Sequence, residues 1–348
     1  MSKPRVYVTR QLFDEALDIL RSRAEVEVFE GVDDAIPRDL LLSKVRNVEG
    51  LLPLLTDRID AEMMDAGENL KVISNYAVGY NNIDVEAATE RGIYVTNTPG
   101  ILTETTADCA FALLMAVARR IAEADRHVRS GGWVHAWGPR MFIGSDVHGK
   151  TLGIIGMGRI GTAMAKRARG FEMRVIYHDP YRRRDLEEEL GVTYRSMEEV
   201  ISEADFLSVH VPLTEETHHL MNWERLNTMK RTAFLINTSR GPVVNEQALY
   251  KALKERVIAG AGLDVFEQEP IDPNSPLLTL DNIVTTPHIA SASIETRTKM
   301  AVTAAKNLVS VLEGKEPPNL VNPEVKKRRP LKRWGHAPDW GSISPRSS

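Results

Sequence analysis

Residues 151–161 read Thr-Leu-Gly-Ile-Ile-Gly-Met-Gly-Arg-Ile-Gly and contain three glycines in the spacing G-x-G-x-x-G. The apolar residues 152–155 are typical of a buried parallel strand, and 162–169 continue with a helical pattern. Gly156 allows a tight turn, Gly158 lets a pyrophosphate approach the backbone, and Gly161 lets the helix pack closely on the strand. The free amides of the helix N-terminus favour an anion, so the stretch predicts a nucleotide-binding turn.

A second strand and an acidic residue support this interpretation. The apolar run 173–178 follows the helix and ends at Asp179, which lies 18 residues after Gly161. A carboxylate that binds the ribose of a dinucleotide is expected about 20 residues beyond the glycines. The glycine spacing alone is a weak signal, because ordinary tight turns share it. The order of strand, turn, helix and strand makes a dinucleotide site the better interpretation.

The composition limits the possible classes of protein. The chain has 348 residues, 43% of them hydrophobic and 26% charged, with a net charge of −4. This length exceeds what one hydrophobic core usually supports, so we expect two domains. The charge gives no reason to expect nucleic acid or a membrane as a partner, and no run of 18 apolar residues or signal peptide is present. We therefore expect a cytoplasmic enzyme, with its one cysteine, Cys109, in an apolar helix of the core.

Short apolar runs alternate with helical patterns along most of the chain, which predicts the α/β class with two doubly wound parallel sheets. The runs expected as strands of the first sheet are 6–9, 26–29, 50–55, 72–75 and 94–96. Those expected as the six strands of the second sheet are 152–155, 173–178, 206–210, 232–237, 260–263 and 283–286.

Two long helical patterns indicate how the domains are connected. Residues 103–129 predict one helix that crosses between domains, and 296–313 predict a second helix that returns the chain. We therefore expect a domain of residues 100–288 inserted into a domain made of 1–99 and 289–326. The aromatic segment 133–142 is too apolar for a free loop, so something should cover it. The basic, aperiodic residues 327–348 should form a disordered tail.

Three side chains that suit a 2-oxo acid follow strands of the second sheet. Arg240 offers a planar fork that can pair with a carboxylate and an adjacent carbonyl oxygen. His288 could donate a proton to that oxygen, and a neighbouring Glu269 would help the imidazole keep the proton to higher pH. Each residue alone is more typical of a surface or structural role. Together, at carboxyl ends of strands in one sheet, they favour catalysis.

Other features are less informative. The loop Asn75-Tyr-Ala-Val-Gly-Tyr-Asn-Asn-Ile-Asp84 follows a strand, and the amides of Val78 and Gly79 could hold a carboxylate, although a plain turn is commoner. No cysteine pair and no H-E-x-x-H motif indicates a metal site. Four further histidines are expected to be surface residues: His127, His148, His218 and His219.

The chain resembles the D-isomer-specific 2-hydroxyacid dehydrogenases, and within that family it is most similar to the glyoxylate and hydroxypyruvate reductases. The resemblance covers about residues 3–325. It rests on the loop 75–84 and the glycine-rich stretch 149–161, and on five shorter motifs: Val95-Thr-Asn-Thr-Pro-Gly100, Val211-Pro-Leu-Thr214, Asn237-Thr-Ser-Arg-Gly241, Gly262-Leu-Asp-Val-Phe-Glu-Gln-Glu-Pro270 and Pro287-His-Ile. It implies a Rossmann-type NAD domain inserted into a flavodoxin-like substrate domain.

The resemblance also implies roles for individual residues. Arg240 would bind substrate, His288 would donate the proton, Glu269 would support the histidine, and Asp264 would hold the nicotinamide carboxamide. The coenzyme would also contact the glycines of the turn and Arg159, Ile160, Pro212, Thr238, Ser239, Arg240, His288 and Ala290. Family members form dimers through the segment that corresponds to 100–148. Trp137 resembles an aromatic residue that reaches the partner's substrate pocket.

These features together predict an NAD(P)H-dependent reductase of a small 2-oxo acid, glyoxylate or hydroxypyruvate first. Asp179 favours NAD, although Arg182, Arg183 and Arg184 leave NADP possible. A 3-phosphoglycerate or D-lactate dehydrogenase is an alternative. A non-catalytic, NAD-sensing corepressor on the same scaffold is another, and turnover of a 2-oxo acid would exclude it.

Overall fold

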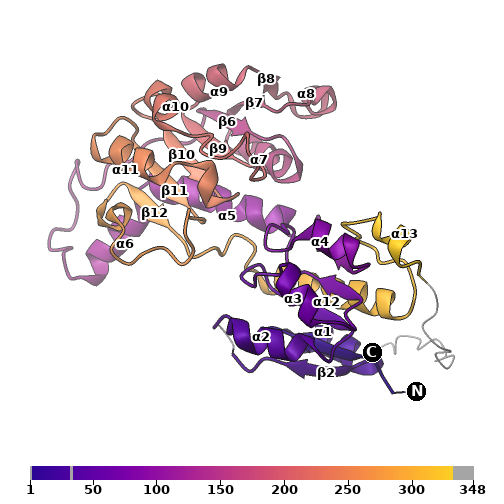
Figure 1. The fold of residues 1–348 in the computed structure, drawn as a ribbon. Helices are drawn as coiled ribbons and strands as arrows, with labels where there is room; N and C mark the ends of the chain where they lie inside the picture. Colours follow the sequence, from indigo (N-terminus) through magenta and orange to yellow (C-terminus); the bar gives the residue numbers. More distant parts are fainter. Residues whose placement is uncertain (1, 32–33, 332–348) are drawn as a thin grey trace, which may run out of the picture. The chain divides into compact units, whose positions relative to one another are not determined.

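The computed structural model describes residues 2–31 and 34–331. The described chain folds into two compact units (Figure 1). The first unit contains the described residues of Met1–Leu102 and Ser293–Ser348, and the second is Thr103–Ala292.

The first unit is built on a five-stranded parallel sheet with the order β2-β1-β3-β4-β5. The strands are β1 (Arg5–Val8), β2 (Glu25–Val28), β3 (Gly50–Leu52), β4 (Val72–Ser74) and β5 (Tyr94–Thr96). Because side chains alternate along β1, Val6 and Val8 pack under α1 and α12, whereas Tyr7 packs under the helices of the other face. These helices are α1 (Asp14–Arg23) and α12 (Ile294–Leu312) on one face, and α2 (Arg38–Val45), α3 (Ala61–Ala66) and α4 (Val85–Glu90) on the other. The strand order is that of flavodoxin-like folds.

The second unit contains a seven-stranded parallel sheet with the order β12-β11-β10-β9-β6-β7-β8. The strands are β6 (Thr151–Ile155), β7 (Arg174–His178), β8 (Thr193–Tyr194), β9 (Phe206–Val209), β10 (Phe234–Asn237), β11 (Gly260–Leu263) and β12 (Ile283–Thr285). Strand order reverses between β6 and β9, which is where doubly wound sheets bind dinucleotides. The expectation of six strands was wrong, because β8 has only two residues and leaves no apolar run in the sequence.

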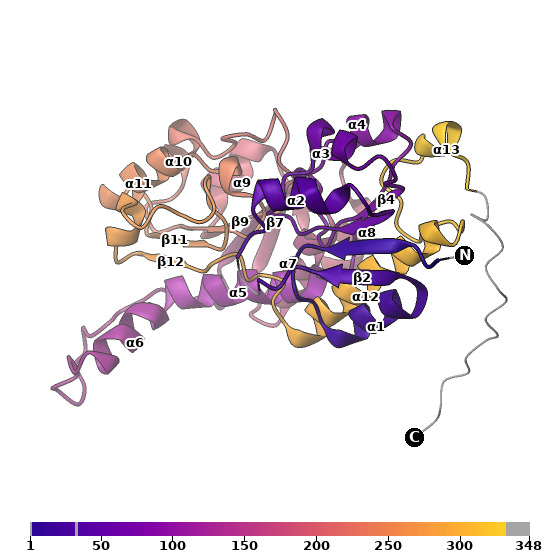
Figure 2. The ribbon, with the colours of Figure 1, turned by 60° about the horizontal axis from the view of Figure 1, so that its bottom comes forward.

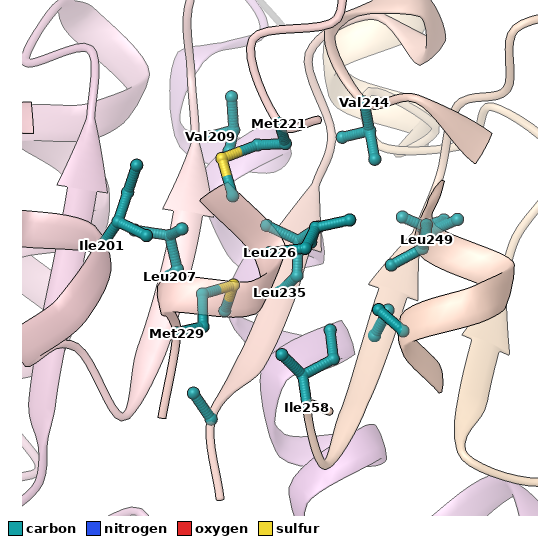
Figure 3. Packing of buried hydrophobic residues seen from close by; sticks show 14 of the residues in the cluster. Ile201, Leu207, Val209, Met221, Leu226, Met229, Leu235, Val244, Leu249 and Ile258 are labelled. Atoms are coloured by element: carbon teal, nitrogen blue, oxygen red, sulfur yellow. The ribbon is translucent and has the colours of Figure 1, made fainter. Parts of the chain in front are cut away.

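Helices cover both faces of this sheet, so each face has its own core. Leu207, Val209 and Leu235 pack with Met221, Leu226 and Leu249 on one face (Figure 3). That face is covered by α9 (Met197–Glu203), α10 (Trp223–Thr228) and α11 (Glu246–Lys254); the other is covered by α5 (Thr103–Ala118), α7 (Arg159–Arg169) and α8 (Arg184–Leu190). Two well-filled cores fix the strand ends on which the candidate site is built.

The single helix expected over 103–129 is two helices. α5 ends at Ala118 and α6 spans Ile121–Arg129, because Arg120 adopts a left-handed conformation with φ of 54° that interrupts the helical hydrogen bonds. The Arg120 guanidinium pairs with Glu123 at 2.6 Å and lies 5.2 Å from the ring centre of Phe142. These contacts hold the turn between the two helices.

α6 and the loop after it project from the rest of their unit in both views (Figures 1 and 2). No residue of α6 is buried. Trp133 and Trp137 are 55% and 79% exposed, so the described chain leaves these two side chains largely uncovered. An exposed apolar surface of this kind is typical of an interface between chains.

The basic segment near the C-terminus begins with ordered structure. Residues 325–328 form α13 (Val325–Arg328), the Arg329 carbonyl oxygen accepts a 2.5 Å hydrogen bond from the Tyr94 hydroxyl, and Arg329 Nη1 donates to the Leu70 carbonyl oxygen. Residues 327–331, expected in a disordered tail, therefore belong to the first unit. The other residues of the expected tail, 332–348, lie outside the described residues.

Candidate active site

The glycine-rich turn between β6 and α7 is tight at two glycines and open at the third. A Cβ atom on Gly156, whose φ is 95°, would lie 2.7 Å from the His210 carbonyl oxygen, and one on Gly161 would lie 2.1 Å from the Gly156 carbonyl oxygen. No atom lies within 4 Å of a Cβ position on Gly158, the N-cap of α7, which has no side-chain cap. The turn therefore leaves space for a phosphate beside the free amides of the helix.

A cavity of about 270 Å³ adjoins this turn. It is lined by Gly158 and three basic side chains, Arg159, Lys166 and Arg183, among other residues. The Arg183 guanidinium donates to the Met157 carbonyl oxygen at 3.1 Å, which anchors it beside the turn. The positive charge of these side chains suits a diphosphate.

Asp179 lies at the end of β7 and is hydrogen-bonded to the glycine-rich turn. Its Oδ2 accepts from the Met157 amide at 2.8 Å, and its Oδ1 accepts from the Tyr181 amide at 2.9 Å. The cations that follow it are partly neutralised, because Arg182 pairs with Glu187 at 2.8 Å and Arg183 with Asp185 at 2.6 Å. Asp179 therefore presents a negative charge at the position where a ribose is expected.

His288 and Glu269 are in direct contact. Nδ1 of His288 lies 2.6 Å from Oε2 of Glu269, while Oε1 of Glu269 accepts from the Phe266 amide at 3.0 Å. Burial raises the pKa of the Glu269 carboxyl, but the hydrogen bond and charge of His288 outweigh it, and the pKa lies below its ordinary value. The carboxylate is thus ionised at neutral pH and fixes the tilt of the imidazole ring.

Arg240 lies on the loop after β10, close enough to Glu269 for their charges to interact. Burial lowers the pKa of its guanidinium, and the charge of Glu269 opposes that effect. Asn237, the last residue of β10, shapes the loop: its Nδ2 donates to the Arg240 carbonyl oxygen and its Oδ1 accepts from the Ser239 amide. Sequence reasoning gave Asn237 no role, although a fully buried asparagine at a strand end must find such partners.

Asp264 holds the loop that carries His288. This buried carboxylate accepts hydrogen bonds from the Thr286 hydroxyl at 2.6 Å and from the amides of Ile289 and Ala290, both at 2.8 Å. The His288 amide donates to the Asp264 carbonyl oxygen at 2.9 Å, and His288 has a left-handed φ of 54°. The resemblance implies that Asp264 also contacts the nicotinamide. The same carboxylate would then bind the coenzyme and orient His288. A left-handed non-glycine residue costs about 1–3 kcal/mol, and backbone strain of this kind clusters at functional sites.

The remaining residues expected to touch coenzyme lie in the same unit. Thr238 is buried, and its hydroxyl has no hydrogen-bond partner among the described residues, as expected of a group that meets a ligand. Ala290 is buried, Ile160 and Ser239 are half-buried, and the Pro212 carbonyl oxygen accepts from the Thr217 hydroxyl. The open space at Gly158 and the Thr238 hydroxyl, which has no partner among the described residues, are both compatible with a bound dinucleotide.

The expected substrate loop lies in the first unit, after β4. Asn97 Nδ2 donates to the Val78 carbonyl oxygen at 2.7 Å, and Asn75 Nδ2 donates to the Gly79 carbonyl oxygen at 2.9 Å. Asn82 Nδ2 also ties this loop to the carbonyl oxygens of Leu54 and Asp57. These bonds fix the direction of the peptide groups around Val78 and Gly79.

Cys109 packs against the core of the second unit, and burial, with the charge of Asp264, raises the pKa of its thiol to about 11, which disfavours a nucleophilic thiolate. Residues 2–31 and 34–331 contain no group of three or more histidine, cysteine, aspartate or glutamate side chains placed to hold a metal. No helix in that part of the chain is long and apolar enough to cross a membrane.

Comparison with known proteins links this geometry to a family. A family model described as "D-isomer specific 2-hydroxyacid dehydrogenase, NAD binding domain" matches residues 111–290. Among the similar curated proteins, glyoxylate reductase from Korarchaeum cryptofilum is 58% identical over 329 residues, 94% of this chain and 98% of the relative. Glyoxylate reductase from Pyrococcus horikoshii is 53% identical over 330 residues, with coverage of 94% and 98%.

Solved structures are similar over nearly the whole chain. The crystal structure of a Thermus thermophilus protein superimposes with a TM-score of 0.86 at 51% identity, covering 91% of this chain and 99% of that one. An NADPH-dependent glyoxylate/hydroxypyruvate reductase from Sinorhizobium meliloti, in complex with NADP and malonate, gives a TM-score of 0.79 at 35% identity, with coverage of 93% and 98%. Both similarities extend across the two units.

Proposed function

Because the chain belongs to the D-isomer specific 2-hydroxyacid dehydrogenase family, we propose that it reduces glyoxylate or hydroxypyruvate to the corresponding D-2-hydroxy acid with NADH. The contact that carries this proposal is the 2.6 Å pair of His288 and Glu269, with the Arg240 charge beside it. The names of the curated relatives support the choice of substrate.

The three residues have separate tasks in the proposed reaction. When bound, the nicotinamide coenzyme supplies the hydride that reaches the keto carbon. Arg240 binds the substrate carboxylate and carbonyl oxygen, which neutralises charge that develops on that oxygen. His288 donates a proton to the oxygen, and Glu269 holds the imidazole in place and stabilises its charged form. The amides of Val78 and Gly79 would also bind the substrate carboxylate.

We further propose that residues 100–288 form a coenzyme-binding domain and that residues 1–99 and 289–326 form a substrate-binding domain. Gly156, Gly158 and Gly161 with α7 would hold the diphosphate, and Asp179 would accept hydrogen bonds from the ribose hydroxyls. The other proposed coenzyme contacts are Arg159, Ile160, Pro212, Thr238, Ser239, Arg240, Asp264, His288 and Ala290. Since Arg182 and Arg183 already pair with carboxylates, NADH should be preferred and NADPH used at a higher KM.

A panel of 2-oxo acids, each assayed with NADH and NADPH, tests these proposals. We expect the highest kcat/KM with glyoxylate or hydroxypyruvate and NADH. Preference for pyruvate or a phosphorylated oxo acid would favour one of the alternative dehydrogenases. A preference for NADPH would mean that the arginines, and not Asp179, set the choice of coenzyme. No turnover with any oxo acid would favour the NAD-sensing role.

We also propose that the protein is a cytoplasmic homodimer whose interface includes residues 100–148. The exposed Trp133 and Trp137, with α6, supply an apolar surface for a second copy of the chain. Trp137 would then reach the substrate pocket of the partner. A lone cysteine, Cys109, without a disulfide is typical of a reducing compartment.

A further inference from the structure

The loop that carries Glu269 is tied to the start of α11 by two reciprocal hydrogen bonds. The Glu246 amide donates to Oε1 of Glu267 at 3.0 Å, and the Glu267 amide donates to Oε1 of Glu246 at 2.5 Å. Glu246 is the first residue of α11 and Glu267 lies two residues before Glu269. We call this arrangement the Glu246–Glu267 clasp.

His219 joins the clasp from a third segment. Its Nε2 lies 2.9 Å from Oε1 of Glu267, and its Nδ1 lies 3.2 Å from Nδ2 of Asn245, the N-cap of α11. The His219 amide donates to the Pro242 carbonyl oxygen at 2.7 Å. A residue expected to be a plain surface histidine therefore links three segments around the base of the Glu269 loop.

The same loop rests on the backbone beside Arg240. A Cβ atom on Gly241 would lie 1.8 Å from the carbonyl carbon and oxygen of Phe266 and 2.5 Å from the Glu267 nitrogen. The Phe266 amide in turn donates to Oε1 of Glu269. A shift of residues 266–267 would therefore be transmitted both to the carboxylate that touches His288 and to the loop of Arg240.

The clasp brings like charges together. Burial raises the pKa of Glu246 and the hydrogen bond from the Glu267 amide opposes this effect, but the charges of Glu267 and Glu269 raise the pKa further. His219 faces Glu267, while His288 and Arg240 face Glu269 on the other side. The two hydrogen bonds from backbone amides hold the carboxylates together despite this repulsion.

We propose that the Glu246–Glu267 clasp positions Glu269, and through it the imidazole of His288, for proton donation to the substrate. The inference rests on the proposed function, in which His288 is the proton donor. Glu246 and Glu267 are positioning residues and do not touch substrate. Their backbone bonds set where the Glu269 carboxylate lies.

Three variants separate geometry from charge. Glu246→Ala removes the bond from the Glu267 amide and the charge, whereas Glu246→Gln keeps an acceptor oxygen and removes only the charge. Glu255→Gln, at the exposed other end of α11, is the matched control. We expect Glu246→Ala to lower kcat about 10-fold with little change in the KM for NADH, since a misplaced catalytic group costs rate more than coenzyme binding.

The conservative variant should give a different pattern. Glu246→Gln keeps an oxygen that can accept from the Glu267 amide, so it should recover most of the kcat that Glu246→Ala loses, as Glu255→Gln keeps the kcat of the parent. A folded Glu246→Ala protein with the parent kcat and pH–rate profile would overturn the proposal. So would a Glu246→Gln protein as impaired at neutral pH as Glu246→Ala, because geometry and charge would then not separate.

A spectroscopic measurement tests the clasp without turnover. The hydrogen-bonded Nδ1 proton of His288 should give a downfield NMR signal in the holoenzyme that disappears in His288→Ala. We expect Glu246→Ala to shift or broaden this signal and Glu255→Gln to leave it unchanged. An unchanged signal in Glu246→Ala would refute the clasp even in an active enzyme. If Glu246→Ala shifts the signal as expected but the parent protein reduces no oxo acid, the proposed function is refuted and the positioning role of the clasp is not.

Discussion

Nδ1 of His288 lies 2.6 Å from Oε2 of Glu269, although 19 residues separate them in the chain. The contact depends on two anchors. The Phe266 amide holds the other oxygen of Glu269, and the buried Asp264 holds the loop around His288. An ionised carboxylate against one ring nitrogen leaves the opposite nitrogen, Nε2, available for the proton donation that we propose.

Replacement of the proposed donor should affect chemistry more than binding. His288→Ala should lower kcat by about 10²- to 10⁴-fold, because proton donation acts in the transition state. The dissociation constant for NADH, measured by fluorescence titration, should change little. Near-normal turnover would mean that another group supplies the proton.

Loss of the supporting charge should be milder. Glu269→Gln can still accept a hydrogen bond from His288 but no longer stabilises the imidazolium, so reduction should fade at a lower pH than in the parent. The pH–rate profile of kcat/KM for glyoxylate measures this. An alkaline limb at the parent position would show that the charge of Glu269 does not act on His288.

The close approach at Gly241 predicts a stability effect. A methyl group there would overlap the backbone of Phe266, so Gly241→Ala should lower the free energy of unfolding by about 1–3 kcal/mol in urea titrations. Gly158→Ala is the matched control, because its added Cβ meets no atom within 4 Å. It should keep the parent stability and weaken NADH binding. Equal stability of both variants and the parent would contradict the packing argument.

His210 should make folding sensitive to acid. Burial lowers the pKa of this imidazole from 6.5 to about 4. Below pH 6.5 the imidazole binds a proton in the unfolded chain, whereas in the folded chain it does not bind one until about pH 4. The free energy of unfolding should therefore decrease as the pH is lowered from 6.5 to about 4, by up to about 3 kcal/mol. His210→Gln should show a shallower loss of unfolding free energy between these pH values. An identical slope would mean that His210 titrates normally in the folded protein.

The exposed tryptophans predict an oligomer. Light scattering at micromolar concentration should give the mass of a dimer, and Trp137→Ala should raise the KM for the oxo acid while NADH binding stays the same. Gln247→Ala, a substitution on the surface of α11, is a suitable control. A monomeric parent protein would contradict the proposed interface.

Much of this organisation could be predicted from local patterns. The spacing of Gly156, Gly158 and Gly161 after an apolar run predicts a strand, a phosphate turn and a helix, because each glycine answers a steric need that acts over a few residues. The alternation of apolar runs and helical patterns predicts parallel sheets for the same local reason. Arg240, Glu269 and His288 were candidates because each follows such a run.

Features that depend on contacts between residues far apart in the sequence could not be predicted from local patterns. β8 is too short to leave a pattern, and the break at Arg120 depends on Glu123 and the ring of Phe142. The roles of Asp264 and of the Glu246–Glu267 clasp appear only when several loops meet at one edge of the sheet. The sequence by itself determined the strands, the turn and the kinds of reactive group, because these follow from neighbouring residues. Only the tertiary structure decided which carboxylate touches which donor, because hydrogen bonds and charge interactions act over a few ångströms of space and not along the chain.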